Sequence, residues 1–278
     1  MLFFGKQIFT FAKKKMLPSV IYQDLGRISY HQAWDYQFEL LKQVIDKKLA
    51  IKNLETSPSV SFSENLISEQ SSYLLFCEHN HVYTLGKSGS TTHLLLNETE
   101  LAEQGIEFFK INRGGDITYH GEGQITGYPI FDMECFFTDV HKYVRALEEV
   151  IIRTIAEYGL LGFRIKEYTG VWVEGSTHSV SSQKKRKICA IGVHLSRWVT
   201  MHGFAFNVNT DLGFYNNIIP CGIEDDDKTV TSLSAELGKK IDMNEVKEKL
   251  KHHFSEVFGF AFSHFQNQSP SVESLKSI

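Results

Sequence analysis

The spacing of apolar residues predicts three long helices. From Ser29 to Leu49 the apolar positions recur every three or four residues, and Ser29 with Gln32 forms a capping box at the start. The stripe expected to face the core consists of Trp34, Phe38, Leu41, Ile45 and Leu49. A second helix is expected from about Asp139 to Tyr158, with a buried face of Val140, Val144, Leu147, Ile151 and Ile155. A last helix is expected from Asp242 to about Phe258, where Gly259 ends it.

Shorter apolar runs predict strands on both sides of the second helix. Before it lie "YLLFCE" from Tyr73, "VYTL" from Val82 and "EFFKI" from Glu107, and after it lie "GVWVE", "KICAIGVHL" and "MHGFAFNVN". The serine-rich stretch from Glu55 to Ser72 is expected to be a loop. Strands and helices do not alternate strictly. We therefore expect one α/β unit of the α+β type, with a mixed, largely antiparallel sheet flanked by helices.

Composition and charge narrow the function classes. The chain is 42% hydrophobic and 22% charged, as in ordinary globular proteins, and its net charge of -4 argues against a nucleic-acid binder. No apolar run is long enough to suggest a membrane span. The four cysteines are far apart without a CxxC pair, which indicates reduced thiols and a cytoplasmic protein. Residues 1–15 are basic and permit a targeting role, but we favour an upstream start before Met16, with the catalytic domain spanning 16–278.

Several local motifs fail as cofactor or metal sites. Gly86-Lys87-Ser88 resembles half of a phosphate loop, but His81 stands where its first glycine is required. The glycines of "GEGQITG" are spaced one residue too widely for a dinucleotide fingerprint. His79 and His81 have a chelating spacing without a convincing third ligand. The run "KKRK" at 184–187 is expected to be a solvated turn. We expect neither a metal nor a cofactor.

Two segments have unusual backbone chemistry. Four glycines lie between Arg113 and Gly123 in "RGGDITYHGEG", which gives the backbone freedom that neither a helix nor a strand needs. Cys221 stands between Pro220 and Gly222 outside any periodic element, so its thiol is presented at a bend. From this pattern alone, a nucleophile and an inert loop cysteine are both possible. The other cysteines sit among large apolar residues and are expected to fill the core: Cys77, Cys135 and Cys189.

Together the motifs resemble a known enzyme family. "RGGDITYHGEGQ", "GVWV", "KICAIGVHLSRWVTMHGFAFNVNTDL", "IIPCGI" and "VTSLSAELG" are similar, in order and spacing from about Tyr22 to Phe258, to the lipoyl(octanoyl) transferases. The resemblance implies the single-domain fold shared with biotin protein ligases and lipoate ligases. The chain departs from the family pattern at Asn80 and Glu122, where proline is usual. Glu122 is expected to loosen its loop or to add charge at its lip.

The resemblance also implies an activity, partners and site residues. The enzyme would move an octanoyl group from octanoyl-acyl carrier protein to a lysine of lipoyl domains, in 2-oxoacid dehydrogenase E2 subunits and glycine cleavage H protein. Cys221 would carry the thioester with Lys187 as its partner, without ATP, in a monomer. The acyl pocket would be lined by Arg113, Gly114, Gly115, Asp116, Ile117, Thr118, Tyr119, His120, Ala190, Ile191, Gly192, Gly203, Phe204 and Ala205.

Elementary chemistry agrees with much of this assignment. Alternation along "MHGFAFNV" places Gly203 and Ala205 on a face of small residues, opposite Phe204 and Phe206, and leaves a channel for a slim apolar chain. The glycines at 114, 115, 121 and 123 are expected to let the backbone approach the acyl group and offer amides to it. In a regular strand Lys187 points away from Ala190, so we expect it at the strand's ragged start.

Two charge states are possible for Lys187, and two other functions compete with octanoyl transfer. An unperturbed lysine is neutral only about once in 2,500 at pH 7, so Lys187 must be either a desolvated base or a cation beside the thiolate. The competing functions are an ATP-dependent lipoate ligase, which would not need Cys221, and a non-catalytic acyl or carrier-protein binding module. A docking patch for an acidic carrier protein is expected on Lys184, Lys185, Arg186, or on Lys142 and Arg145.

Overall fold

A large mixed sheet forms the centre of the computed structural model, which describes residues 17–55, 71–174, 184–219 and 227–263. The strand order is β12-β1-β2-β6-β10-β9-β8-β7, with β11 against β9. Strand β1 runs parallel to β2 and β12, and β11 runs parallel to β9, while the other neighbours are antiparallel. The strands are β1 (Ser19–Arg27), β2 (Ser71–Glu78), β6 (Gln124–Ile130), β7 (Gly162–Ile165), β8 (Tyr168–Val173), β9 (Lys185–Ser196), β10 (Val199–Asn207), β11 (Lys228–Val230) and β12 (Ala261–Phe262).

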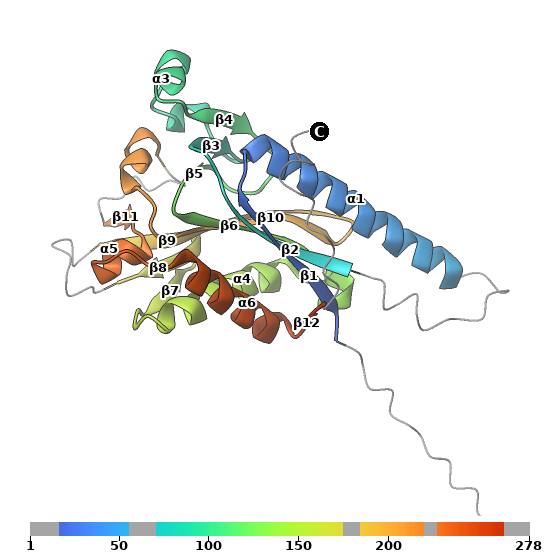
Figure 1. Ribbon diagram of the computed structural model, residues 1–278. Helices are drawn as coiled ribbons and strands as arrows, with labels where there is room; N and C mark the ends of the chain where they lie inside the picture. The colour runs from blue at the N-terminus through green and yellow to red at the C-terminus, as the bar shows by residue number, and fades with distance from the viewer. Residues whose placement is uncertain (1–16, 56–70, 175–183, 220–226, 264–278) are drawn as a thin grey trace, which may run out of the picture.

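A second, three-stranded sheet lies at one end of the large one (Figure 1). Its order is β4-β3-β5, and its core also takes in side chains from two short helical segments, α3 and η3. These elements are β3 (Val82–Leu85), α3 (Glu98–Glu103), β4 (Glu107–Lys110), β5 (Ile117–His120) and η3 (Leu212–Asn217). The expected mixed, largely antiparallel architecture is therefore confirmed.

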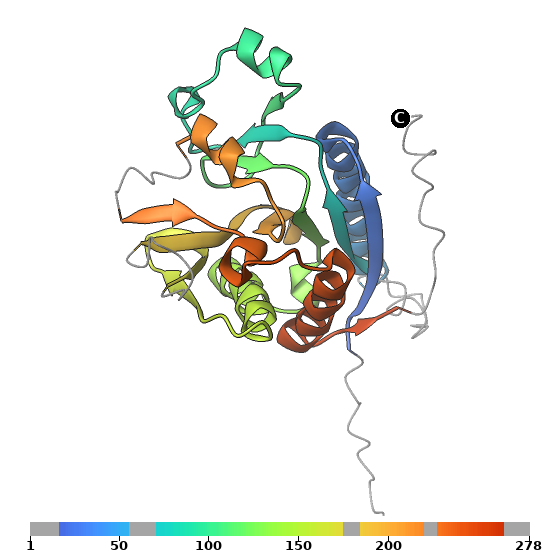
Figure 2. The ribbon, with the colours of Figure 1, turned by 60° about the vertical axis from the view of Figure 1, so that its left-hand side comes forward.

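Helices cover both faces of the large sheet (Figures 1 and 2). Helix α1 (Tyr30–Glu55) packs on one face, and α4 (Val140–Ala156) and α6 (Met243–Phe258) lie side by side on the other. Each face has its own apolar core, so the sheet is buried on both sides. The remaining short elements are η1 (Thr91–His93), η2 (Met133–Cys135) and α5 (Leu233–Leu237).

The predicted helix starts are confirmed by their caps, whereas α1 runs to Glu55, beyond the predicted end at Leu49. Ser29 accepts a hydrogen bond from the Gln32 backbone N–H at 3.3 Å, and Asp242 accepts two at the start of α6. Gly259 ends α6 with φ at 68°, in the left-handed region that glycine adopts without strain. Asp139 accepts from the Lys142 backbone N–H and begins α4.

The predicted buried stripe of α1 is partly wrong. Leu41 is buried as expected, but Phe38 and Leu49 are exposed. The sheet-facing side instead carries Ala33, Tyr36, Leu40, Leu41 and Val44. The helix has apolar residues on more than one side, so helical spacing alone selected a neighbouring face. In α4 the stripe holds for Leu147, Ile151 and Ile155, whereas Val140 at the first turn is exposed.

The basic run at 184–187 is not a solvated turn. Lys185, Arg186 and Lys187 belong to β9, and the side chains of Arg186 and Lys187 are buried. Cys77 and Cys189 are fully buried, as expected of core residues, and Cys135 is half-buried. No helix in the described ranges is long and apolar enough to cross a bilayer.

Candidate active site

A narrow pocket lies where the 113–115 loop meets strands β5, β9 and β10. Its inner part has a volume of about 40 Å³ and opens into a wider cleft of about 380 Å³. Of the residues implied by the resemblance, the pocket brings together Arg113, Gly115, Thr118, His120, Lys187, Ala190, Ile191, Gly192, Gly203, Phe204 and Ala205. Gly114 and Asp116 line only the wider cleft.

The side chains of β5 point alternately to the pocket and to the core of the small sheet. Thr118 and His120 line the pocket, whereas Ile117 and Tyr119 point into the core of the small sheet. Alternation along the strand causes this division. The expectation that Ile117 and Tyr119 contact the acyl group is therefore wrong. Asp116 Oδ2 lies 2.5 Å from His93 Nδ1 at the edge of the wider cleft.

A β-bulge places Lys187 in the pocket. Val171 pairs with Cys189 and Trp172 pairs with Lys187, so Ile188 is an extra residue on β9. One extra residue reverses the alternation, and Lys187 then shares the pocket with Ala190 and Gly192. The expectation of a ragged strand start is wrong, because β9 begins at Lys185 and is paired with both neighbours at Lys187.

The Lys187 side chain is held against an indole ring. It is 5% exposed, and its Nζ lies 4.8 Å from the centroid of the Trp172 ring. A cation over the face of an indole is attracted by the ring quadrupole. Gly170, at φ 126°, leaves room beside it, because a Cβ there would lie 3.5 Å from Lys187 Cε and 2.5 Å from the Cys189 carbonyl oxygen.

The glycines around the pocket serve close packing of backbone more than contact with a ligand. The Gly114 N–H donates to the Val193 carbonyl at 2.9 Å, so it is not offered to the acyl group. A Cβ on Gly192 would lie 2.7 Å from the Gly114 carbonyl oxygen, and one on Gly203 would lie 2.2 Å from that of Gly127. We expected the glycines of the 113–123 motif to present amides to the ligand, and this is wrong for Gly114. Gly115, at φ 89°, does line the pocket.

The same correction holds for the second pair of glycines in the motif. A Cβ on Gly121 would collide with the Tyr119 hydroxyl, and one on Gly123 would lie 2.6 Å from the backbone of Asn209. Neither glycine lines the pocket or the cleft. The smallness of Gly121 leaves room for the Tyr119 ring, and that of Gly123 lets the turn before β6 pack against the segment after β10.

Arg113 ties the pocket loop to the small sheet. Its Nη2 donates to the carbonyl and to the hydroxyl of Thr84 at 2.7 and 3.0 Å, and Nη1 donates to the Gly114 carbonyl at 3.1 Å. The guanidinium is 7% exposed. A buried cation held mainly by backbone and hydroxyl oxygens gives the pocket wall a positive potential.

Two buried histidines, His120 and His202, line the pocket together with Tyr128, and a third, His79, is hydrogen-bonded to Tyr128. Burial lowers the pKa of His79 to about 4 and that of His202 to about 3, and it holds the pKa of His120 well below its usual range. The His79 ring is fixed at both nitrogens, to the Ile28 carbonyl at 2.9 Å and the Tyr128 hydroxyl at 2.7 Å. These contacts occupy the nitrogens that the sequence pattern had suggested as chelating.

Sequence reasoning missed several lining residues and a side chain that holds one of them. The missed lining residues are Tyr30, Thr126, Tyr128, Thr169 and His202. Gln124 receives the His120 Nδ1–H at 3.0 Å, donates to Asn207 Oδ1 at 3.0 Å, and so positions His120 in the pocket. Asn207 in turn donates to the Thr231 carbonyl, just after β11. In the sequence, the only indication of a role for Gln124 was its position at the end of the glycine-rich motif.

Cys221 lies outside the described residues. The chain before it is anchored at Ile219, whose N–H donates to the His93 carbonyl at 2.8 Å. After the gap, Val230 of β11 pairs with Lys187, and the Thr231 N–H donates to the Lys187 carbonyl at 2.9 Å. The described residues that follow the gap thus pair with β9 at Lys187.

The two departures from the family pattern meet at one side chain. Arg27 donates from Nε to Asn80 Oδ1 at 2.9 Å and from Nη2 to Glu122 Oε1 at 2.5 Å. Glu122 therefore pins its loop to the end of β1, which contradicts the expectation that it loosens this loop. All three side chains are at the surface, and none lines the pocket.

Comparisons with known proteins agree on the family. Residues 29–255 match the model of the lipoyl protein ligase A/B catalytic domain. An octanoyltransferase of Flavobacterium johnsoniae is 56% identical over 237 residues, 85% of this chain and 95% of its own. One from Cytophaga hutchinsonii is 51% identical over 245 residues, 88% of this chain and 95% of its own. A bipartite lipoate protein ligase of Thermoplasma acidophilum, with a TM-score of 0.61 at 14% identity, covers 94% of this chain and 91% of its own and shares the fold.

Proposed function

This chain belongs to the octanoyltransferases, within the lipoyl protein ligase A/B catalytic domain family, and we propose that Cys221 carries the octanoyl group during transfer. Octanoyl transfer in protein lipoylation is the activity that the relatives share. The observation that carries the proposal is the bulge that directs Lys187 into a narrow pocket with one face of small residues. The lipoate-ligase alternative is not favoured.

The reaction is a double displacement. The Cys221 thiolate attacks the thioester carbonyl of an octanoyl-carrier protein, the new S–C bond forms, the C–S bond to the carrier breaks, and the carrier thiolate leaves and takes a proton from solvent. The neutral ε-amine of a lysine on a lipoyl domain then attacks the enzyme thioester. The amide forms, the C–S bond to Cys221 breaks, the amine proton passes to solvent, and the Cys221 thiolate is restored. No other reactant is consumed.

The walls of the pocket suit an unbranched acyl chain. Gly192, Gly203 and Ala205 contribute almost no side-chain volume, while Ile191 adds apolar surface. Burying one methylene stabilises the complex by about 0.8 kcal/mol, which supports selection by chain length. The Arg113 loop and its buried guanidinium lie at the polar end, where the carbonyl oxygen gains charge during attack.

Lys187 acts as a cation beside the Cys221 thiolate. The contact of its Nζ with the Trp172 ring favours the charged form, and a nearby cation lowers the pKa of a thiol. This contact supports the ion-pair role over that of a neutral base. The remaining cysteines of the chain are poor competitors, because burial raises the pKa of Cys135 to about 11 and those of Cys77 and Cys189 well above the usual range.

Intact mass spectrometry tests the covalent intermediate. The protein is mixed with octanoyl-carrier protein without ATP or acceptor, and we expect a mass gain of one octanoyl group. Cys221→Ala should abolish the gain, whereas Cys135→Ala should keep it. Modification of an added lipoyl domain only with octanoate and ATP would indicate a ligase, and no modification at all would indicate a binding module.

Alkylation by iodoacetamide tests the role of Lys187. The rate at Cys221 in Lys187→Met should fall about tenfold or more at pH 7 and recover above the thiol's ordinary pKa near 8.5. Lys184→Met is the matched control, because Lys184 is an exposed lysine immediately before β9. An unchanged rate profile in Lys187→Met would exclude the ion pair.

Acyl carrier and lipoyl-domain proteins are the partners that this activity requires. The lipoyl domains of 2-oxoacid dehydrogenase E2 subunits and of glycine cleavage H protein are the proposed acceptors, and the enzyme is proposed to act as a monomer in the cytoplasm. Carrier docking is proposed at Lys184, Lys185 and Lys142. Arg186 is excluded from this patch because it is buried against Glu236, and Arg145 is paired with Glu148. Charge reversal at Lys184 and Lys185 should weaken carrier binding in a salt-dependent way.

A further inference from the structure

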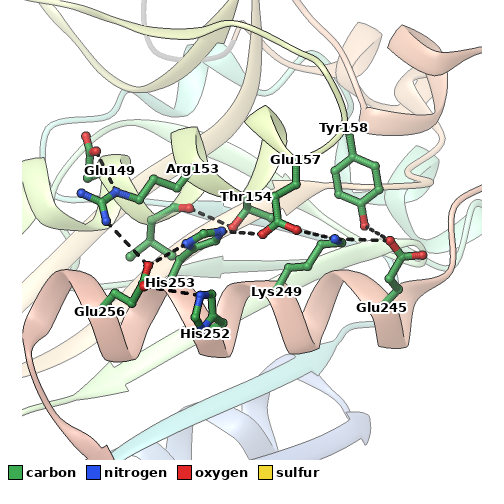
Figure 3. Close-up of polar contacts among 11 residues, drawn as sticks. Glu149, Arg153, Thr154, Glu157, Tyr158, Glu245, Lys249, His252, His253 and Glu256 are labelled. Carbon is green, nitrogen blue, oxygen red and sulfur yellow. Dashed lines mark hydrogen bonds and ion pairs between the residues drawn. The ribbon is translucent and has the colours of Figure 1, made fainter.

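A cluster of histidines and carboxylates lies between α4 and α6, on the sheet face opposite α1 (Figure 3). His252, His253 and Glu256 of α6 form the only group in the described ranges with three potential metal-ligand atoms within 4.8 Å of one another. His252 Nε2 and His253 Nδ1 each lie 3.5 Å from an oxygen of the Glu256 carboxylate. Ligands of a tetrahedral zinc ion are about 3.4 Å apart, given bond lengths near 2.1 Å.

Glu157, which follows the last residue of α4, fixes the tautomer of His253. Its Oε1 lies 2.6 Å from His253 Nε2. A carboxylate only accepts, so Nε2 carries the hydrogen and Nδ1 presents a lone pair in the neutral ring. Metal-binding histidines in proteins commonly donate their other N–H to a carboxylate in this way.

The Nδ1 atom of His253 makes no hydrogen bond, and the Glu256 carboxylate lies 3.5 Å from it. The residue is 8% exposed, and Nδ1 is buried without a hydrogen-bond partner. A buried nitrogen lone pair without a partner is costly, which makes this atom an independent indication of a ligand. His252 and Glu256 are more exposed, so a cation can reach the cluster from solvent. Arg153 Nη1 lies 3.8 Å from Glu256 Oε2.

We propose that His252 Nε2, His253 Nδ1 and the Glu256 carboxylate bind a zinc-type divalent cation, with Glu157 as the positioning residue for His253. Imidazole and carboxylate ligands suit zinc, and a water would complete the coordination. All three ligands belong to α6, and Glu157 belongs to the end of α4, so the ion tightens the contact between these helices. The site lies apart from the acyl pocket and is independent of the proposed mechanism.

Equilibrium dialysis of metal-free protein against Zn²⁺, with elemental analysis, tests the site. Wild type should bind one equivalent more than His253→Gln and Glu256→Gln, because thiols such as Cys221 contribute equally to all three. His31→Gln is the matched control: it removes an exposed helical histidine that lies 2.9 Å from Asp35 at the same spacing of four residues. It should bind like wild type.

The variant Glu157→Gln tests whether Glu157 positions His253 for zinc binding or only contributes to helix packing. It keeps all three ligands, and its zinc affinity should fall about 10- to 100-fold. If His253→Gln fails to fold, His252→Gln serves in its place, because that side chain is 63% exposed. The proposal is overturned if wild type and the ligand variants bind zinc with equal stoichiometry and affinity. That result would mean that these side chains form only the contacts within the protein that the structure shows.

Discussion

The buried ion pair of Arg186 and Glu236 anchors the segment that follows Cys221, and its removal should be costly. Arg186 Nε lies 2.7 Å from Glu236 Oε1 and its Nη2 lies 3.1 Å from Oε2, with both side chains 3% exposed. Thr231 donates its hydroxyl to the same carboxylate at 2.7 Å. The pair therefore joins α5 to β9 beside Lys187.

The expected magnitude follows from burial. Glu236→Leu leaves the guanidinium of Arg186 buried without its carboxylate, which typically costs about 3–5 kcal/mol of unfolding free energy. Glu149 provides the contrast: its side chain is 33% exposed and pairs with Arg153 and Arg164, whose side chains are 44% and 32% exposed. Glu149→Leu should cost no more than about 1 kcal/mol, because solvent screens exposed pairs.

Urea unfolding followed by tryptophan fluorescence measures both costs. The double variant Arg186→Met/Glu236→Leu should recover most of the loss, since an apolar pair of similar volume avoids the desolvation of both charges. The reasoning is refuted if Glu236→Leu costs no more than Glu149→Leu, or if the double variant is as unstable as the single one.

Two further predictions concern His79 and the pocket loop. Because the pKa of His79 is about 4 in the folded state and 6.5 in the unfolded chain, only the unfolded chain takes up its proton as pH falls below 6.5. His79 should thus account for about 2 kcal/mol of stability lost between pH 7 and pH 5. His79→Gln should lose that much less in urea unfolding, and an unchanged pH dependence would contradict the assignment. Gly192→Ala should destabilise by about 1–3 kcal/mol and abolish octanoylation, because its Cβ would meet the Gly114 carbonyl at 2.7 Å. Gly114→Ala should be tolerated in both assays, because its Cβ would find its nearest neighbour at 3.5 Å.

Local signals in the sequence predicted the framework well. Capping residues such as Ser29, Asp139 and Asp242 determine where helices begin through contacts within one turn, so a short window contains the whole cause. The face of α1 was harder. Phe38 and Leu40 are both apolar and close in sequence, and only the position of the sheet decides which of them is buried.

The sequence indicated many of the residues of the candidate site, but not which of them face the pocket. The resemblance named residues that the fold does gather, such as Thr118, Lys187 and Gly203. It also named Ile117 and Tyr119, which share β5 but face another core. A motif records neighbours along the chain, whereas a pocket selects alternate residues from each strand. Gln124 and His202 were missed because they act through contacts with distant segments.

The decisive features of the pocket are local departures from regular strands. Without the extra residue at Ile188, alternation would turn Lys187 toward the apolar core, where an ammonium could not be solvated. His202 lines the same pocket with φ at 59°, a conformation that costs most side chains about 1–2 kcal/mol. Neither irregularity changes the composition or the average period of its strand, so periodicity cannot reveal it. Lys187 and His202 both line the same pocket. A strained backbone persists where the surrounding structure holds it in place, and such positions cluster at functional sites. For Lys187, we propose that the function is to bring a cation to the pocket.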